Sequence, residues 1–180
     1  MSWFLYMQRA HGGLDRFARL TGHTLAWLNI AIVLLVALVV ALRYGAGLHS
    51  MLLMDSAQYL HALLFLACSA WTLREDGHVR VDVLYHRFPA RQRAWVNLLG
   101  TLLLLMPMMG FILWSSWPYA SASWSTLEGS ANSGGLPWVY VLKSLIPLMA
   151  VLMLLQGLAD VLRHALTLCG HPASAEEDVT

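Results

Sequence analysis

Three polar side chains with the potential for chemistry recur at three-residue intervals in an otherwise apolar stretch. They are Asp55, Gln58 and His61, which a helix would place along one face. A carboxylate, an amide and an imidazole in this order could form a proton or ion relay, because ionisable groups inside a membrane are costly and usually functional. The same stripe is typical of a polar contact with another helix or subunit. We favour that interpretation because Asp55 lies near the outer end of the stretch, where water can reach it.

A second candidate site lies in the polar connection that follows. His78, Asp82 and His86 are four residues apart, so one helical turn could bring them together around a metal ion. No other cluster of histidine or cysteine supports a metal site. The arginines among these residues indicate a topology anchor that reaches lipid head groups. The accompanying acidic residue favours an additional contact with a protein partner.

The sequence lacks the residue patterns that several kinds of enzyme need. Gly134 and Gly135 are not followed by the lysine of a phosphate-binding loop. The serines gather in a predicted outer loop, whereas the histidines lie on the inner side or within the membrane, so no nucleophilic triad is indicated. Haem ligation inside a helical bundle needs paired histidines, and only His61 is well placed. We therefore predict a protein that is not an enzyme.

The composition requires a membrane protein. With 58% hydrophobic and 12% charged residues, too little polar surface exists to cover the apolar stretches in water. We predict an all-α integral membrane protein with four transmembrane helices and short amphipathic interfacial helices, since each apolar stretch can cross a hydrocarbon core about 30 Å thick. The predicted parts are an N-terminal interfacial segment (1–22), a four-helix membrane domain (23–165, with spans at about 24–43, 52–73, 94–117 and 137–162) and a tail (166–180) expected to be disordered.

The arginines determine the predicted orientation. Those between the second and third spans are Arg74, Arg80, Arg87, Arg91 and Arg93, whereas the connection 118–136 has none. Basic residues accumulate on the cytoplasmic side, and four crossings return the chain to its starting side. Both termini should therefore be cytoplasmic. Anionic head groups are nearer to these arginines than nucleic acid would be, so we expect membrane lipids, and no nucleic acid, as partners.

The last two spans carry further local signals. Lys143 lies about 9 Å along the fourth span, and we predict an ion pair or near-pair with Asp55, with Glu128 as the second candidate. Pro107 predicts a kink near the centre of the third span. The stretch 121–135 is rich in serine, glycine and asparagine and predicts an outer loop.

The order of several motifs from Leu25 to about Arg163 points to a known family. The motifs are Gln58-Tyr59, then His78-Val79-Arg80-Val81-Asp82-Val83-Leu84-Tyr85 followed by Arg91 and Arg93, then Ser123-Trp124, Glu128, Ser130, Gly134-Gly135-Leu136-Pro137, Lys143, Ile146-Pro147 and Gln156-Gly157. In this order, the chain resembles the small membrane subunit of tripartite ATP-independent periplasmic (TRAP) transporters, the DctQ-like family. It departs from the family pattern in that Asp55 is a lone acid at the start of the second span.

The resemblance implies a non-catalytic subunit of a secondary transporter in the bacterial inner membrane. In such systems a periplasmic binding protein (the P subunit) captures an organic acid, and a large membrane subunit (the M subunit) moves it with a sodium gradient. The small subunit scaffolds the large one. No cofactor is expected in this chain, and sodium ions are expected in the partner subunit.

The resemblance also assigns candidate contacts. The large subunit would meet Asp55, Gln58, His61 and Lys143; the cytoplasmic contact and lipid anchor would be Arg74, His78, Arg80, Asp82, Arg87, Arg91 and Arg93; the periplasmic partner would meet Trp117, Tyr119, Glu128 and Trp138. Two alternatives stay open: a haem- or quinone-associated membrane anchor of a redox complex, and a stand-alone small channel.

Overall fold

The regular structure of this chain is helical throughout the part that the computed structural model describes, residues 27–75, 77 and 88–169. The elements are α2 (Leu28–Gly45), α3 (Met51–Arg74), α5 (Ala90–Gly100), the π-helical turn η1 (Thr101–Leu105), α6 (Met106–Thr126) and α7 (Val139–Leu168). Four apolar helical stretches in these ranges are long enough to cross a membrane, with α5, η1 and α6 forming one of them. The prediction of an all-helical protein with four transmembrane helices is therefore confirmed.

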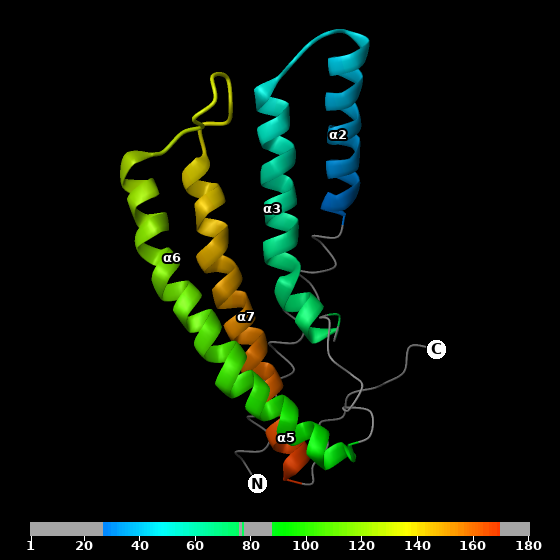
Figure 1. Ribbon diagram of the computed structural model, residues 1–180, viewed down its shortest axis with the longest axis vertical. Helices are drawn as coiled ribbons and strands as arrows, with labels where there is room; N and C mark the ends of the chain where they lie inside the picture. Colours follow the sequence, from blue (N-terminus) through cyan, green and yellow to red (C-terminus); the bar gives the residue numbers. More distant parts are fainter. Residues whose placement is uncertain (1–26, 76, 78–87, 170–180) are drawn as a thin grey trace.

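The four membrane helices stand in a row (Figure 1). Helix α7 packs against α6 on one side and α3 on the other, and α2 packs against the far side of α3. The connections 46–50 and 127–138 lie at the same end of the row, which we call the loop end (Figure 1). A row leaves two broad faces of most helices uncovered, unlike the closed bundle that four spans first suggest.

Helix α7 contributes more buried residues than any other helix in the described part of the chain. Its buried residues are Leu145, Pro147, Ala150, Met153, Gln156, Gly157, Ala159, Asp160 and Leu166. Several are small, which lets the neighbouring helices approach closely. At Gly157, for example, an added Cβ would lie 2.7 Å from Leu105 Cδ2 of η1. The interior of the described part is therefore centred on α7, with smaller contributions from α3 and α6.

The third membrane helix contains a π-helical turn directly before Pro107. There the Met106 N–H donates to Thr101 O, one residue further back than in an α-helix. Pro107 has no N–H to donate to the preceding turn, which favours an irregularity at this point. The structure thus has a π turn beside Pro107, and the kink expected there stays a prediction.

The third membrane helix also continues beyond its predicted end at 117 and into the predicted loop 121–135. It ends at Thr126, so the predicted start of the loop is wrong. Most hydroxyl groups of this segment donate to backbone carbonyls one turn earlier, as Ser121 Oγ does to Pro118 O (3.0 Å) and Ser125 Oγ to Ala122 O (2.7 Å). These bonds accommodate serine in a helix although its composition is typical of a loop.

The remaining boundaries differ by a few residues. Helix α7 continues to Leu168, so the predicted tail is helical at 166–168. The interfacial segment 1–22 and the rest of the tail from 170 lie outside the described residues.

Candidate functional site

The turn after α6 positions an acidic side chain at the loop end. Leu127 adopts a left-handed backbone conformation (φ 46°), and the Glu128 N–H donates to Ser123 O (3.1 Å). This reversal is a common way to end a helix, because it satisfies carbonyls that lack a helical partner. It also directs the Glu128 side chain back towards α6 and α7.

Glu128 and Lys143 form the ion pair of the loop end. Lys143 Nζ donates to Glu128 Oε2 (2.5 Å), and Ser123 Oγ donates to the same oxygen (2.7 Å). Lys143 Nζ also lies 4.2 Å from the centre of the Tyr119 ring, within the range of a cation–π contact. The hydrogen bonds from Lys143 and Ser123 hold the pKa of the Glu128 carboxyl below its ordinary value. Glu128 is therefore a carboxylate at neutral pH.

Asp55 has a different partner. Its Oδ2 accepts a hydrogen bond from the Leu136 N–H (2.9 Å), and its side chain is buried, with 9% of the residue exposed. The predicted Asp55–Lys143 pair is therefore not formed, and Lys143 binds the second candidate, Glu128. The reason is the path of the loop, which brings the Leu136 N–H to Asp55. The spacing of Asp55 and Lys143 in the sequence does not predict where this loop lies.

Gly135 makes the approach of the loop to α3 possible. A Cβ at this position would collide with Asp55 Oδ2 and Ser130 Oγ and would lie 2.7 Å from Ser130 Cβ. The Ser130 N–H donates to Leu136 O (3.1 Å) on the other strand of the loop. The loop 127–138 is thus tied to α3 at Asp55 and to α7 at Lys143.

The predicted polar stripe is divided by the structure. Asp55 is buried, whereas Gln58 and His61 are exposed. Each step of three residues rotates the side-chain direction by about 300°, which is about 60° less than a full turn. Two such steps separate Asp55 from His61, so their side chains point in directions about 120° apart. Gln58 and His61 instead continue an exposed stripe on α3, which we call the α3 stripe: Met54, Gln58, His61 and Phe65. Phe65 is 70% exposed, and its ring stacks with His61 at 6.5 Å between centroids.

Only part of the predicted cytoplasmic contact can be located. Arg74 pairs with its neighbour Glu75, Arg93 Nε donates to Phe88 O (2.8 Å), and Arg91 is exposed. The other predicted members, and the candidate metal ligands, lie outside the described residues: His78, Arg80, Asp82, His86 and Arg87. Within the described ranges, no group of three histidine, cysteine or acidic side chains is arranged to hold a metal ion.

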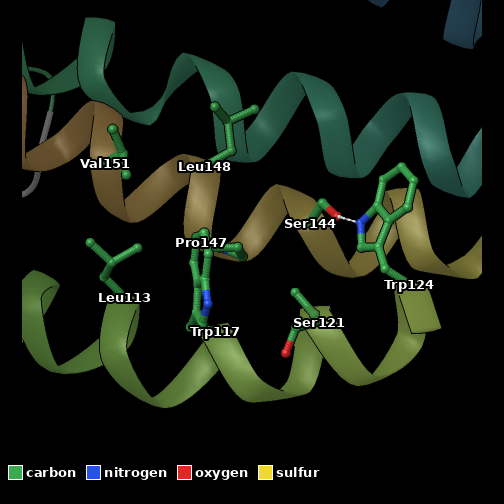
Figure 2. A pocket seen from close by; sticks show the side chains of 9 residues that line it. Leu113, Trp117, Ser121, Trp124, Ser144, Pro147, Leu148 and Val151 are labelled. Carbon is green, nitrogen blue, oxygen red and sulfur yellow. Dashed lines mark hydrogen bonds between the residues drawn. The ribbon is translucent and has the colours of Figure 1, made fainter.

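The predicted periplasmic surface is aromatic and exposed. Trp117, Tyr119 and Trp138 are all exposed, with Trp117 at 65%. An apolar groove of about 450 Å³ is lined by residues of α6 and α7, Trp117 among them. Figure 2 shows Trp117 extending from α6 towards Pro147 of α7. Trp124 closes one end of this groove, and its Nε1 donates to Ser144 Oγ (2.7 Å) (Figure 2). Sequence reasoning missed this bond, because the two residues are 20 positions apart and neither belongs to a spaced motif.

The comparisons with known proteins add the family. The model of the family described as "Tripartite ATP-independent periplasmic transporters, DctQ component" matches residues 32–167. Neither the comparison with curated proteins nor that with solved structures gave a match. The family match covers all four membrane helices in large part and the loop that joins α6 to α7, and it favours a transporter component over a redox anchor. The chain is therefore a multi-pass membrane protein that belongs to the DctQ family of TRAP transporter components.

Proposed function

We propose that this chain is the small subunit that scaffolds the large membrane subunit of a TRAP transporter. In this proposal the complex lies in the inner membrane of a bacterium, with both chain termini in the cytoplasm and the loop end in the periplasm. The large subunit imports an organic acid with a sodium gradient and receives it from a periplasmic binding protein. This chain itself catalyses no reaction, and the sodium ions belong to the partner.

The exposed polar residues of the α3 stripe are the observation that carries this proposal. Gln58 and His61 lie about 10 and 15 Å from the start of α3 at Met51, which places them inside a core about 30 Å thick. A polar group that has no hydrogen-bond partner in lipid destabilises the protein by several kcal/mol. This is comparable to the free energy of a hydrogen bond in an apolar medium. A partner helix that hydrogen-bonds Gln58 and His61 would remove this cost.

The shape of the fold supports the same proposal. A row of helices buries little of its own surface, so a larger membrane protein can cover one whole face of it. The loop end offers a second surface, where Tyr119 lies beside Lys143 of the Glu128–Lys143 pair and Trp138 is exposed in the same connection. We assign this surface to the periplasmic binding protein, because exposed aromatic residues are enriched at protein interfaces, whose rims are polar.

Co-purification with the large subunit tests the scaffold. The double substitution Gln58→Leu and His61→Leu keeps the helix apolar and able to insert, but removes the hydrogen-bonding groups. We expect about tenfold less large subunit to be retained, equivalent to the loss of about 1.4 kcal/mol. Ser115→Leu on α6 is the matched control, since Ser115 is also an exposed polar residue of a membrane helix. Full retention by the double variant would refute the α3 stripe as the contact.

Transport itself is tested by uptake in cells. Sodium-dependent uptake of the organic acid should require this chain together with the large subunit and the binding protein. A purified chain that carries haem absorbance, or uptake that is unchanged without the chain, would contradict the proposal.

A further inference from the structure

A second groove, of about 640 Å³, lies between the α5–η1–α6 helix and α7, towards the end of the row opposite to the loops. Its lining changes along its length. Asn97, Asp160, Arg163 and His164 lie at one end, and residues such as Met108 lie at the other. The two helices run antiparallel, so the polar residues of both meet at the same end. We call this space the methionine groove.

Arg163 has unused donor capacity at the polar end. One terminal nitrogen of its guanidinium lies 3.2 Å from Asp160 Oδ1. Its Nε is buried, so a ligand would bind the terminal N–H groups of this side chain, which is 27% exposed and lines the groove. Since a guanidinium presents five N–H donors in a fixed planar arrangement, an acceptor with several oxygens could still bind it.

Arg163 also lies at the right depth for a lipid head group. Helix α7 has 30 residues and is about 45 Å long, whereas the hydrocarbon core measures about 30 Å. Arg163 is five residues from the end of α7, so it lies about 7 Å from that end. This is the interfacial region, in which phosphate groups of lipids are found.

The rest of the groove is apolar and adaptable. Met108, Met109 and Met153 line it, and methionine side chains conform readily to irregular apolar ligands. Gly100 also lines it, and a Cβ at Gly100 would meet nothing within 4 Å. The missing side chain at Gly100 therefore contributes directly to the open volume.

We propose that the methionine groove binds one membrane phospholipid, with its phosphate on Arg163 and an acyl chain along Met108 and Met153. Arginine pairs strongly with phosphate because two parallel N–H donors match its oxygens. Basic pockets between transmembrane helices are known to hold lipid head groups. The combination of a guanidinium at interfacial depth and a methionine-lined apolar space matches the two parts of a phospholipid.

The length and direction of the groove suit a lipid. From Asn97 to Met108 the wall is about 17 Å long, and it runs from the polar end into the apolar part of the helix row. A phospholipid lies in the same direction, with its phosphate at the interface and its acyl chains in the hydrocarbon core.

The first test fills the groove. The full-length chain is purified in mild detergent, and bound phospholipid is counted by native mass spectrometry and by extraction with phosphate analysis. We expect about one retained phospholipid per chain. Gly100→Leu should lose it, whereas Gly110→Leu should keep it, because a Cβ at Gly110 also meets nothing within 4 Å but Gly110 does not line the groove. Equal retention by both variants would overturn the proposal.

The second test removes the phosphate ligand. With phosphatidylglycerol as the probe, Arg163→Gln should bind about tenfold more weakly, as expected for the loss of a charge-assisted bond. Arg43→Gln, at an exposed arginine outside the groove, should bind like the wild type. The proposal does not rest on the partner proposed above. If Gly100→Leu instead reduced retention of a co-expressed large subunit while the phospholipid count stayed unchanged, the groove would be a protein contact and the proposal would be wrong.

Discussion

Helices α2 and α7 are about equally apolar, but α2 lies at the edge of the row and is mostly exposed, whereas α7 lies inside it. Their most apolar stretches have mean hydropathies of 2.2 and 2.1. Nine residues of α7 are buried, whereas α2 has one, Ile32. Hydropathy therefore predicts that a helix enters the membrane, and it does not predict which helix forms the interior.

The two helices differ in where their small residues face. Ala150 and Ala159 of α7 have no exposed surface, and Gly157 touches the π turn of the neighbouring helix. Alanine residues also occur in α2, but Ala31, Ala37 and Ala41 are exposed. In lipid, close packing of small residues replaces the hydrophobic effect as the force that associates helices. Helix α7 is the centre of the row because its neighbours meet its small residues.

Enlarging a small residue should reveal the largest difference in stability between α7 and α2. Ala159→Leu adds three carbons at a position with no exposed surface, and overpacking of this kind costs about 1–3 kcal/mol and occasionally more. Ala37→Leu in α2 places the same three carbons in an exposed position and should change stability little. Thermal unfolding of both purified variants in detergent measures the difference. Equal unfolding temperatures would show that α7 is not the interior.

The tie between α3 and the loop should have the next largest effect. Asp55→Ala removes the acceptor of the buried Leu136 N–H, and an unsatisfied buried donor costs about 1–3 kcal/mol. Asp55→Asn retains an acceptor oxygen and should restore part of the stability. The unfolding temperature of each variant is the readout. If alanine and asparagine are equally harmless, the hydrogen bond does not hold the loop.

The tie between α7 and the loop should matter less. Lys143→Met removes the ion pair with Glu128 but keeps most of the aliphatic side chain. Glu128 is 40% exposed, and exposed ion pairs contribute little to stability, so we expect the unfolding temperature to fall by about 2 °C or less. Combining Lys143→Met with Glu128→Gln should add almost nothing further. Additive effects of the two changes would mean that the residues act independently.

Acidification should have the smallest effect at this site. The pKa of Glu128 is lowered in the folded protein, so the pair stabilises the fold above the ordinary carboxyl pKa of about 4.3. This contribution is lost as the pH falls below that value towards the lowered folded pKa. The unfolding temperature of the wild type should therefore fall more between about pH 5 and 3 than that of Glu128→Gln. Parallel pH profiles would contradict the assignment of the shift to this pair.

Much of the architecture could be predicted from the sequence because it depends on local properties. The four membrane helices follow from long apolar stretches, and the family follows from motifs in a fixed order, which the match over residues 32–167 confirms. The ends of helices were less predictable. Serine and threonine after Pro118 are typical of a loop, yet most of their hydroxyls bond to the preceding turn and the helix continues to Thr126.

The sequence by itself determined that this chain lies in a membrane, how often it crosses and which family it belongs to. These properties depend on composition, segment length and motif order, and no distant contact alters them. Only the tertiary structure decided that Lys143 binds Glu128, that Asp55 is buried under Leu136 while His61 stays exposed, and that the helices form a row around α7. Each of these depends on the direction in which a helix presents a residue and on where a loop returns, and both are set by packing between segments far apart in the sequence.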